Sequence, residues 1–156
     1  MVHVIIIADA SSSISSRMME GFKETLIEVF PSKGFLCTIL TFNNNVNIVY
    51  MHQPYRPNLI EKMTCGTGLS NLYLAVQECN SIADKNKEPT VVIYIGDGDA
   101  SDMVDITSKS SRYIKSKMAL IVGKEPSNTI MSDFIKYTMS EASLNQIKKD
   151  LAYLLK

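Results

Sequence analysis

The sequence predicts an α/β domain built on a Rossmann-like, doubly wound and mostly parallel sheet, with helices on both faces. Several apolar runs rich in β-branched residues are continuous rather than alternating, which is typical of strands buried on both faces of a parallel sheet. Segments with helical spacing of apolar residues separate these runs. A chain of 156 residues is also long enough to bury a core without disulfides.

Continuous apolar runs predict four strands, and a fifth strand follows a short turn. The four runs are Val2–Ala8, Phe35–Phe42, Thr90–Ile95 and Met118–Val122. Val46–Met51 follows the second run after only three asparagines. Because so short a link makes a hairpin but not a parallel crossover, we expect Val46–Met51 to be an antiparallel edge strand. Numbered along the chain, the strands are expected in the order 3-2-1-4-5.

Apolar residues at helical spacing predict three helices. The first has a face made by Ile14, Met18, Phe22, Leu26 and Val29 or Phe30, and the second by Leu69, Leu72, Val76, Cys79 and Ala83. The third runs over Leu144–Leu155 with Ser143 as its cap. Residues 52–64 are interpreted as a surface connection. A short helix near Asn128–Asp133 and a sixth strand near Phe134–Thr138 both stay open.

Composition and charge exclude several classes of function. Sixteen basic and sixteen acidic residues give a net charge of zero, so broad electrostatic capture of nucleic acid or an anionic membrane surface is not expected. No apolar run is longer than Val4–Ala8, which is too short to span a bilayer, and the first residues do not resemble a signal peptide. Three unclustered cysteines argue for a reducing compartment. We therefore expect a single cytoplasmic domain over residues 1–156.

Polar loops follow the two strands that flank the reversal of winding in the predicted sheet. Asp9–Ser13 follows the first strand and Gly96–Asp99 follows the fourth, so two carboxylates are expected to face one crevice. Alternate residues of an extended loop point the same way, which lets Asp9, Ser11 and Ser13 converge. A third loop adds the hydroxyl of Thr67 between two glycines. A site of oxygen atoms without histidine or cysteine favours one Mg²⁺ or Mn²⁺ ion.

These three loops resemble the motifs of von Willebrand factor A (vWA) domains. Asp9-Ala10-Ser11-Ser12-Ser13 after an apolar strand is similar to the DxSxS motif of that family. Gly66-Thr67 lies where the family has its metal-binding threonine, and Asp97-Gly98 lies where it has a second aspartate. The chain departs from the pattern at Gly96, where the family commonly has threonine, and at Cys65, where a second glycine is frequent.

The resemblance implies a metal-ion-dependent adhesion site (MIDAS). Ser11, Ser13 and Thr67 would be ligands of the ion, and Asp9 and Asp97 would contact it directly or through water. The family usually binds protein partners, often through an Asp or Glu side chain of the partner that completes the metal sphere. The expected function is therefore a metal-dependent protein-binding module rather than an enzyme.

Two other interpretations stay open. Asp9 at a strand end could accept a phosphoryl group in a Mg²⁺-dependent enzyme, although neither a general base nor a phosphate-binding P-loop is evident. Alternatively, the chain is a vWA-fold interaction protein whose metal site is vestigial. His3 is interpreted as a packed core residue and His52 as a surface-loop residue, so no Ser–His nucleophile is predicted.

Overall fold

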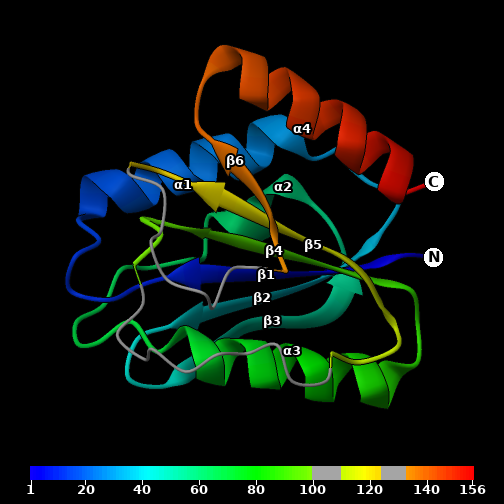
Figure 1. Cartoon of the computed structure of the whole chain (residues 1–156), viewed down its shortest axis with the longest axis horizontal. Helices are drawn as coiled ribbons and strands as arrows, with labels where there is room; N and C mark the ends of the chain where they lie inside the picture. Colours follow the sequence, from blue (N-terminus) through cyan, green and yellow to red (C-terminus); the bar gives the residue numbers. More distant parts are fainter. Residues whose placement is uncertain (100–109, 124–132) are drawn as a thin grey trace.

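Figure 1 shows the computed structural model of the chain, which describes residues 1–99, 110–123 and 133–156. These residues form a six-stranded sheet with the order β3-β2-β1-β4-β5-β6. The sheet is parallel except for one edge strand, β3 (Val46–Pro54), which pairs antiparallel with β2. The other strands are β1 (His3–Asp9), β2 (Leu36–Phe42), β4 (Thr90–Gly96), β5 (Ile114–Ile121) and β6 (Ile135–Thr138). The predicted strand order, the edge strand and the sixth strand are confirmed.

Helices cover both faces of the sheet (Figure 1). On one face lie α1 (Ser16–Val29), α2 (Pro57–Ile60) and α4 (Glu141–Leu154), and on the other lies α3 (Leu72–Asn86). Along β1, Val4 and Ile6 belong to the core cluster under α1, whereas Ile5 and Ile7 belong to the cluster under α3. All four side chains are fully buried, which explains why β1 is a continuous apolar run.

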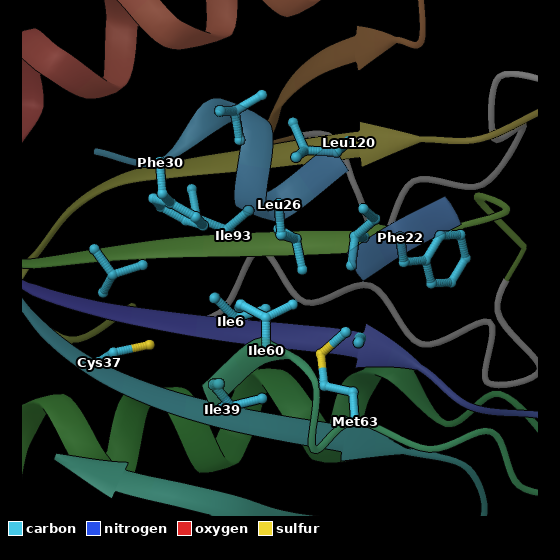
Figure 2. Packing of buried hydrophobic residues seen from close by; sticks show 14 of the residues in the cluster. Ile6, Phe22, Leu26, Phe30, Cys37, Ile39, Ile60, Met63, Ile93 and Leu120 are labelled. Atoms are coloured by element: carbon cyan, nitrogen blue, oxygen red, sulfur yellow. The ribbon is translucent and has the colours of Figure 1, made fainter. Parts of the chain in front are cut away.

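The larger core cluster also includes the segment after β3 (Figure 2). Ile60 and Met63 are fully buried beside the residues of β1 and β2. The ring of Tyr55 stacks on that of Phe35 with centroids 4.5 Å apart. The prediction of a surface connection over residues 52–64 is confirmed for the exposed majority of these residues, but it missed the four buried side chains that anchor the segment to the core, Tyr55, Leu59, Ile60 and Met63. The prolines of this segment have structural reasons: Pro54 lies on the edge strand, and Pro57 begins α2.

Two helices begin later than the apolar spacing predicts. α1 is capped by Ser15, whose hydroxyl accepts a hydrogen bond from the Met18 backbone at 3.1 Å. Ile14 is buried but precedes the helix. α3 begins at Leu72, and Leu69 is 58% exposed in the preceding loop. Ile14 belongs to the same core cluster as α1, whereas Leu69 matches the helical spacing without being buried. Apolar spacing therefore does not locate the start of either helix.

The C-terminal part of the chain differs from the prediction at two points. The cap of α4 is Ser140, whose side chain accepts from the Ser143 backbone, so the predicted Ser143 cap is wrong by three residues. β5 begins at Ile114, four residues before the predicted start, because a partly exposed stretch extends its pairing with β4. The predicted helix near Asn128–Asp133 lies mostly outside the described residues. Within the described ranges, no helix has the length and apolar character needed to cross a bilayer.

The two histidines lie close together rather than apart. His3 is fully buried, as predicted, and burial together with the nearby His52 lowers its pKa to about 4 against a weaker opposing effect of Glu88. His52 is part of β3 and half-buried, so its interpretation as a surface-loop residue is wrong. Its ring lies edge-on to that of His3, with centroids 4.9 Å apart.

Candidate metal centre

The loops after β1 and β4 emerge at the same edge of the sheet. β1 and β4 are parallel neighbours, so their carboxyl ends lie side by side. Asp9 is the last residue of β1, and Asp97 directly follows β4. A cavity of about 220 Å³ opens between these loops, and its lining residues are Ser11, Ser12, Ser13, Gly68, Leu69, Ser70, Asp97 and Asp99.

Three side-chain oxygen groups line this cavity in one hydrogen-bonded row. The hydroxyls of Ser11 and Ser13 lie 3.2 Å apart, and Ser13 Oγ donates to Asp97 Oδ2 at 2.8 Å. Asp97 Oδ1 accepts from the backbone of Asp99 at 3.0 Å, which fixes the carboxylate. In an octahedral Mg²⁺ site, adjacent ligand oxygens are about 2.9 Å apart. The row therefore has the spacing and the oxygen chemistry that a hard divalent ion requires.

Asp9 lies behind the cavity and is not among its lining residues. Its side chain is fully buried, with Oδ1 accepting from the Ser11 backbone at 2.9 Å and Oδ2 accepting from Ser70 Oγ at 3.0 Å. Burial raises the pKa of Asp9, and the nearby Asp97 charge adds to the rise, while the hydrogen bonds from Ser11 and Ser70 oppose it. Asp9 thus holds the Ser11 loop and places negative charge beneath the row of oxygens.

The third loop is attached to the first through its glycines. The Gly66 backbone donates to the carbonyl of Ala10 at 3.1 Å, and both the backbone and the hydroxyl of Ser12 donate to the carbonyl of Gly68 at 3.0 Å. Thr67, between these anchors, is exposed, and its side chain makes no hydrogen bond with the described residues. The structure therefore brings Asp9, Ser11, Ser13 and Asp97 together and places Thr67 outside the hydrogen-bonded row.

The asparagine turn between β2 and β3 supports the third loop as well as the hairpin. Asn44 Oδ1 accepts from the Leu69 backbone at 2.7 Å, and the Asn43 carbonyl accepts from the Asn71 backbone at 3.1 Å. Gly68 has a φ of +96°, and an added Cβ there would lie 2.8 Å from Asn44 Oδ1. The turn residues thus require a glycine at position 68 and fix the loop beside the cavity.

Tyr94 explains why glycine stands at position 96. A Cβ on Gly96 would lie 2.3 Å from Tyr94 Oη and 2.9 Å from the Cβ of Asp9. The tyrosine hydroxyl also accepts from the Gly98 backbone at 3.0 Å, which supports the turn that carries Asp97. The buried phenol therefore fills the space that a side chain at position 96 would need.

Sequence reasoning missed two residues of this site. Ser70 is buried and connects two loops, because its hydroxyl lies within donating distance of both Asp9 Oδ2, at 3.0 Å, and the carbonyl of Asp99, at 3.1 Å. Asp99 adds a second carboxylate to the cavity lining. The available signals were the position of Ser70 just before a helix and the alternation of Asp97 with Asp99. Neither signal shows which hydroxyl contacts Asp9.

Comparison with known proteins gives matches at the level of structure. No family model matches the sequence, and no curated protein matches it. The ArnB paralog VWA2 from Sulfolobus acidocaldarius superposes with a TM-score of 0.71 at 15% identity over 96% of this chain and 44% of that one. Proximal thread matrix protein 1 (PTMP1) from the mussel byssus is described with a zinc-occupied MIDAS motif. It superposes with a TM-score of 0.70 at 17% identity, over 98% of this chain and 45% of that one.

A von Willebrand factor type A protein from Catenulispora acidiphila gives a TM-score of 0.68 at 16% identity, over 99% of this chain and 42% of that one. The chain therefore spans less than half the length of the structures that it matches. At these identities the likeness concerns the fold alone. The chain is a small domain with the vWA fold.

Proposed function

We propose that this chain is a divalent-metal-dependent protein-binding module. One Mg²⁺ or Mn²⁺ ion would be held by Ser11, Ser13 and Thr67, with Asp97 contacting it directly or through water. Asp9 would act from behind the cavity, through water or through the Ser11 loop. The observation that carries this proposal is the hydrogen-bonded row from Ser11 through Ser13 to Asp97.

The donor set supports a hard cation. The row contains hydroxyl and carboxylate oxygens, which suit Mg²⁺ and Mn²⁺ better than softer metals. The zinc named for the MIDAS of PTMP1 belongs to that protein. Thr67 lies between two loop anchors and is exposed, but it is not among the residues that line the cavity. Its role as a ligand therefore requires its side chain to turn toward the ion when the ion binds.

An acidic side chain of a protein partner is the ligand that we propose for the remaining metal position. A bound divalent ion attracts an anionic oxygen strongly, and the cavity opens to solvent at exposed Ser12 and Ser13. Leu69 lines the same cavity and is 58% exposed, so it offers an apolar contact beside the carboxylate. An apolar surface next to an anion site suits a peptide surface better than a free inorganic anion.

The geometry argues against the alternative of phosphoryl transfer by Asp9. An attacking carboxylate oxygen must reach the phosphorus, but Asp9 is fully buried and both of its oxygens accept hydrogen bonds. We therefore keep a binding role for Asp9. The three free cysteines support our placing this module, over residues 1–156, in the reducing environment of the cytoplasm.

Metal-dependent capture of a partner tests this function. The immobilised chain should retain a protein from lysate of its source cells in Mg²⁺ and release it on chelation. Ser13→Ala should reduce capture by about tenfold or more, because it removes an oxygen from the row. Ser12→Ala is the matched control, since its hydroxyl bonds to the Gly68 carbonyl instead, and capture should persist. Capture that survives both chelation and Ser13→Ala would show that the binding surface lies elsewhere.

A further inference from the structure

A second cluster of metal-ligating side chains lies at the opposite end of the sheet. His3 begins β1, His52 lies near the end of β3, and Glu88 lies two residues before the start of β4. One ligand atom from each residue lies within 4.8 Å of the other two, and His52 Nε2 is 2.9 Å from Glu88 Oε2. Because β1 rises about 3.3 Å per residue, His3 is roughly 20 Å from Asp9 at the other end of the strand. In Figure 1 the N-terminal label marks this end of β1.

The backbone of β3 is irregular where it carries His52. His52 has a φ of +51°, one of two positive values among the non-glycine residues described. Near this point, the pairing of β2 with β3 shifts register on both sides of Ile39. Such irregularities re-aim a side chain, and a left-handed non-glycine residue costs about 1 kcal/mol or more. The His52 backbone is held by Thr38 Oγ1, which accepts its N–H at 2.9 Å.

His3 has a buried nitrogen without a partner. Its Nε2 is engaged with Thr38 Oγ1 at 2.6 Å, whereas its Nδ1 has no hydrogen-bond partner. In the part of the chain that the structure describes, the Tyr55 hydroxyl is the one other buried side-chain atom in this condition. Metal-bound histidines commonly donate their second N–H to a neighbouring oxygen, and Thr38 is placed for that role. The unpartnered Nδ1 is then a lone pair available to a cation.

We propose that His3, His52 and Glu88 form a second metal site, distinct from the strand-end cavity, which binds Zn²⁺ or a similar borderline cation. Two imidazoles and one carboxylate are a ligand set that zinc uses with a fourth position left to water. Ligand atoms around tetrahedral zinc are about 3.4 Å apart, so the present separations need adjustments of about 1 Å. The His52 and Glu88 side chains are 33% and 30% exposed, so the ion can enter from solvent.

This second site would tie the edge strand to the centre of the sheet. Within the sheet β3 pairs with β2, and the His52–Glu88 contact of 2.9 Å already links it to the segment before β4. The three ligands come from β3, β1 and the residue pair before β4, so a bound ion would join all three segments at one point. The His3 backbone already donates to the Pro89 carbonyl at 2.9 Å, so two of the three ligand-bearing segments are fixed together before metal binds. Metal binding should therefore stabilise the position of β3.

Cobalt spectroscopy tests the second site separately from the first. Co²⁺ in a tetrahedral nitrogen and oxygen site absorbs visible light strongly, whereas Co²⁺ in an octahedral all-oxygen site absorbs only weakly. Titration of the whole chain with Co²⁺ in excess Mg²⁺ should give the strong band, saturating at one equivalent, and Zn²⁺ should abolish it. The Asp9→Asn variant should give the same band, because it alters the other end of the sheet.

Two conservative variants decide the ligand assignment. His52→Asn removes the imidazole but keeps a residue type that tolerates positive φ, and Glu88→Gln keeps the shape of the side chain. We expect each to weaken Co²⁺ binding by about tenfold or more, with circular dichroism unchanged. If His52→Asn fails to fold, Co²⁺ binding by Glu88→Gln alone tests the ligand assignment. Absence of the band from the unaltered chain, or an undiminished band in Glu88→Gln, would overturn the proposal.

Discussion

Replacing Asp9 with asparagine should weaken Mn²⁺ binding by about 10- to 100-fold without lowering the stability of the metal-free protein. The variant removes a buried negative charge behind the oxygen row, which the proposed ion needs and the metal-free fold does not. Asparagine also fits the hydrogen bonds, because Ser70 Oγ can accept from the new amide and still donate to the Asp99 carbonyl. Calorimetric titration with Mn²⁺ and urea unfolding in chelator measure the two effects.

Asp99→Asn is the matched control for this result. Asp99 lines the same cavity, but its carboxylate is outside the proposed ligand set. The two variants lose the same charge, so a ligand role predicts a much larger effect for Asp9→Asn, whereas general attraction of cations predicts similar effects. Equal Mn²⁺ affinity in Asp9→Asn and in the unaltered chain would contradict a role for Asp9 at the metal.

Replacing Gly96 with threonine, the residue that the motif resemblance led us to expect there, should destabilise this chain by about 3 kcal/mol or more. The new Cβ would lie 2.3 Å from Tyr94 Oη and 2.9 Å from the Asp9 Cβ, so buried groups would have to move. Tyr94 is 1% exposed and cannot swing outward without losing its packing. Urea unfolding monitored by circular dichroism measures the loss.

Two controls connect this loss to Tyr94. Gly21→Ala in α1 adds a Cβ with nothing within 4 Å, so it should stabilise the protein by about 0.5–1 kcal/mol through helix propensity. In a Tyr94→Leu background, Gly96→Thr should cost about 1 kcal/mol less than in the unaltered chain, because the hydroxyl is gone. Additive effects of the two substitutions would mean that the contact with Tyr94 is not the cause.

The strands and their order could be predicted because a strand buried on both faces is a continuous apolar run in the sequence. β1 and β4 are continuous apolar runs, and the short Asn43–Asn45 turn excludes a parallel connection. Helix starts were harder, because Ser140 and Ser143 are equally suitable caps and only the fold decides which one accepts the hydrogen bond. The apolar spacing across Leu69 likewise carries no sign that the residue is exposed.

The site residues that could be predicted are those that directly follow the ends of strands. Asp9, Ser11, Ser13 and Asp97 follow adjacent parallel strands, so topology alone brings them together. Ser70 depends on the path of a long connection, and no local pattern shows that its hydroxyl reaches Asp9 across 61 residues.

The histidine cluster was missed for a related reason. Its formation depends on a backbone irregularity in β3 that gives His52 its positive φ. The residues around His52 follow the ordinary composition of an edge strand followed by a proline-containing segment. Their sequence does not reveal that the ring lies against His3.

Crystals soaked in millimolar Mn²⁺, with diffraction recorded above the manganese absorption edge, test the central claim most directly. The account predicts one anomalous peak in the cavity, within coordination distance of the Ser11 and Ser13 hydroxyls and on the side of Asp97. A peak confined to His3, His52 and Glu88, or no peak between the loops after β1 and β4, would contradict it.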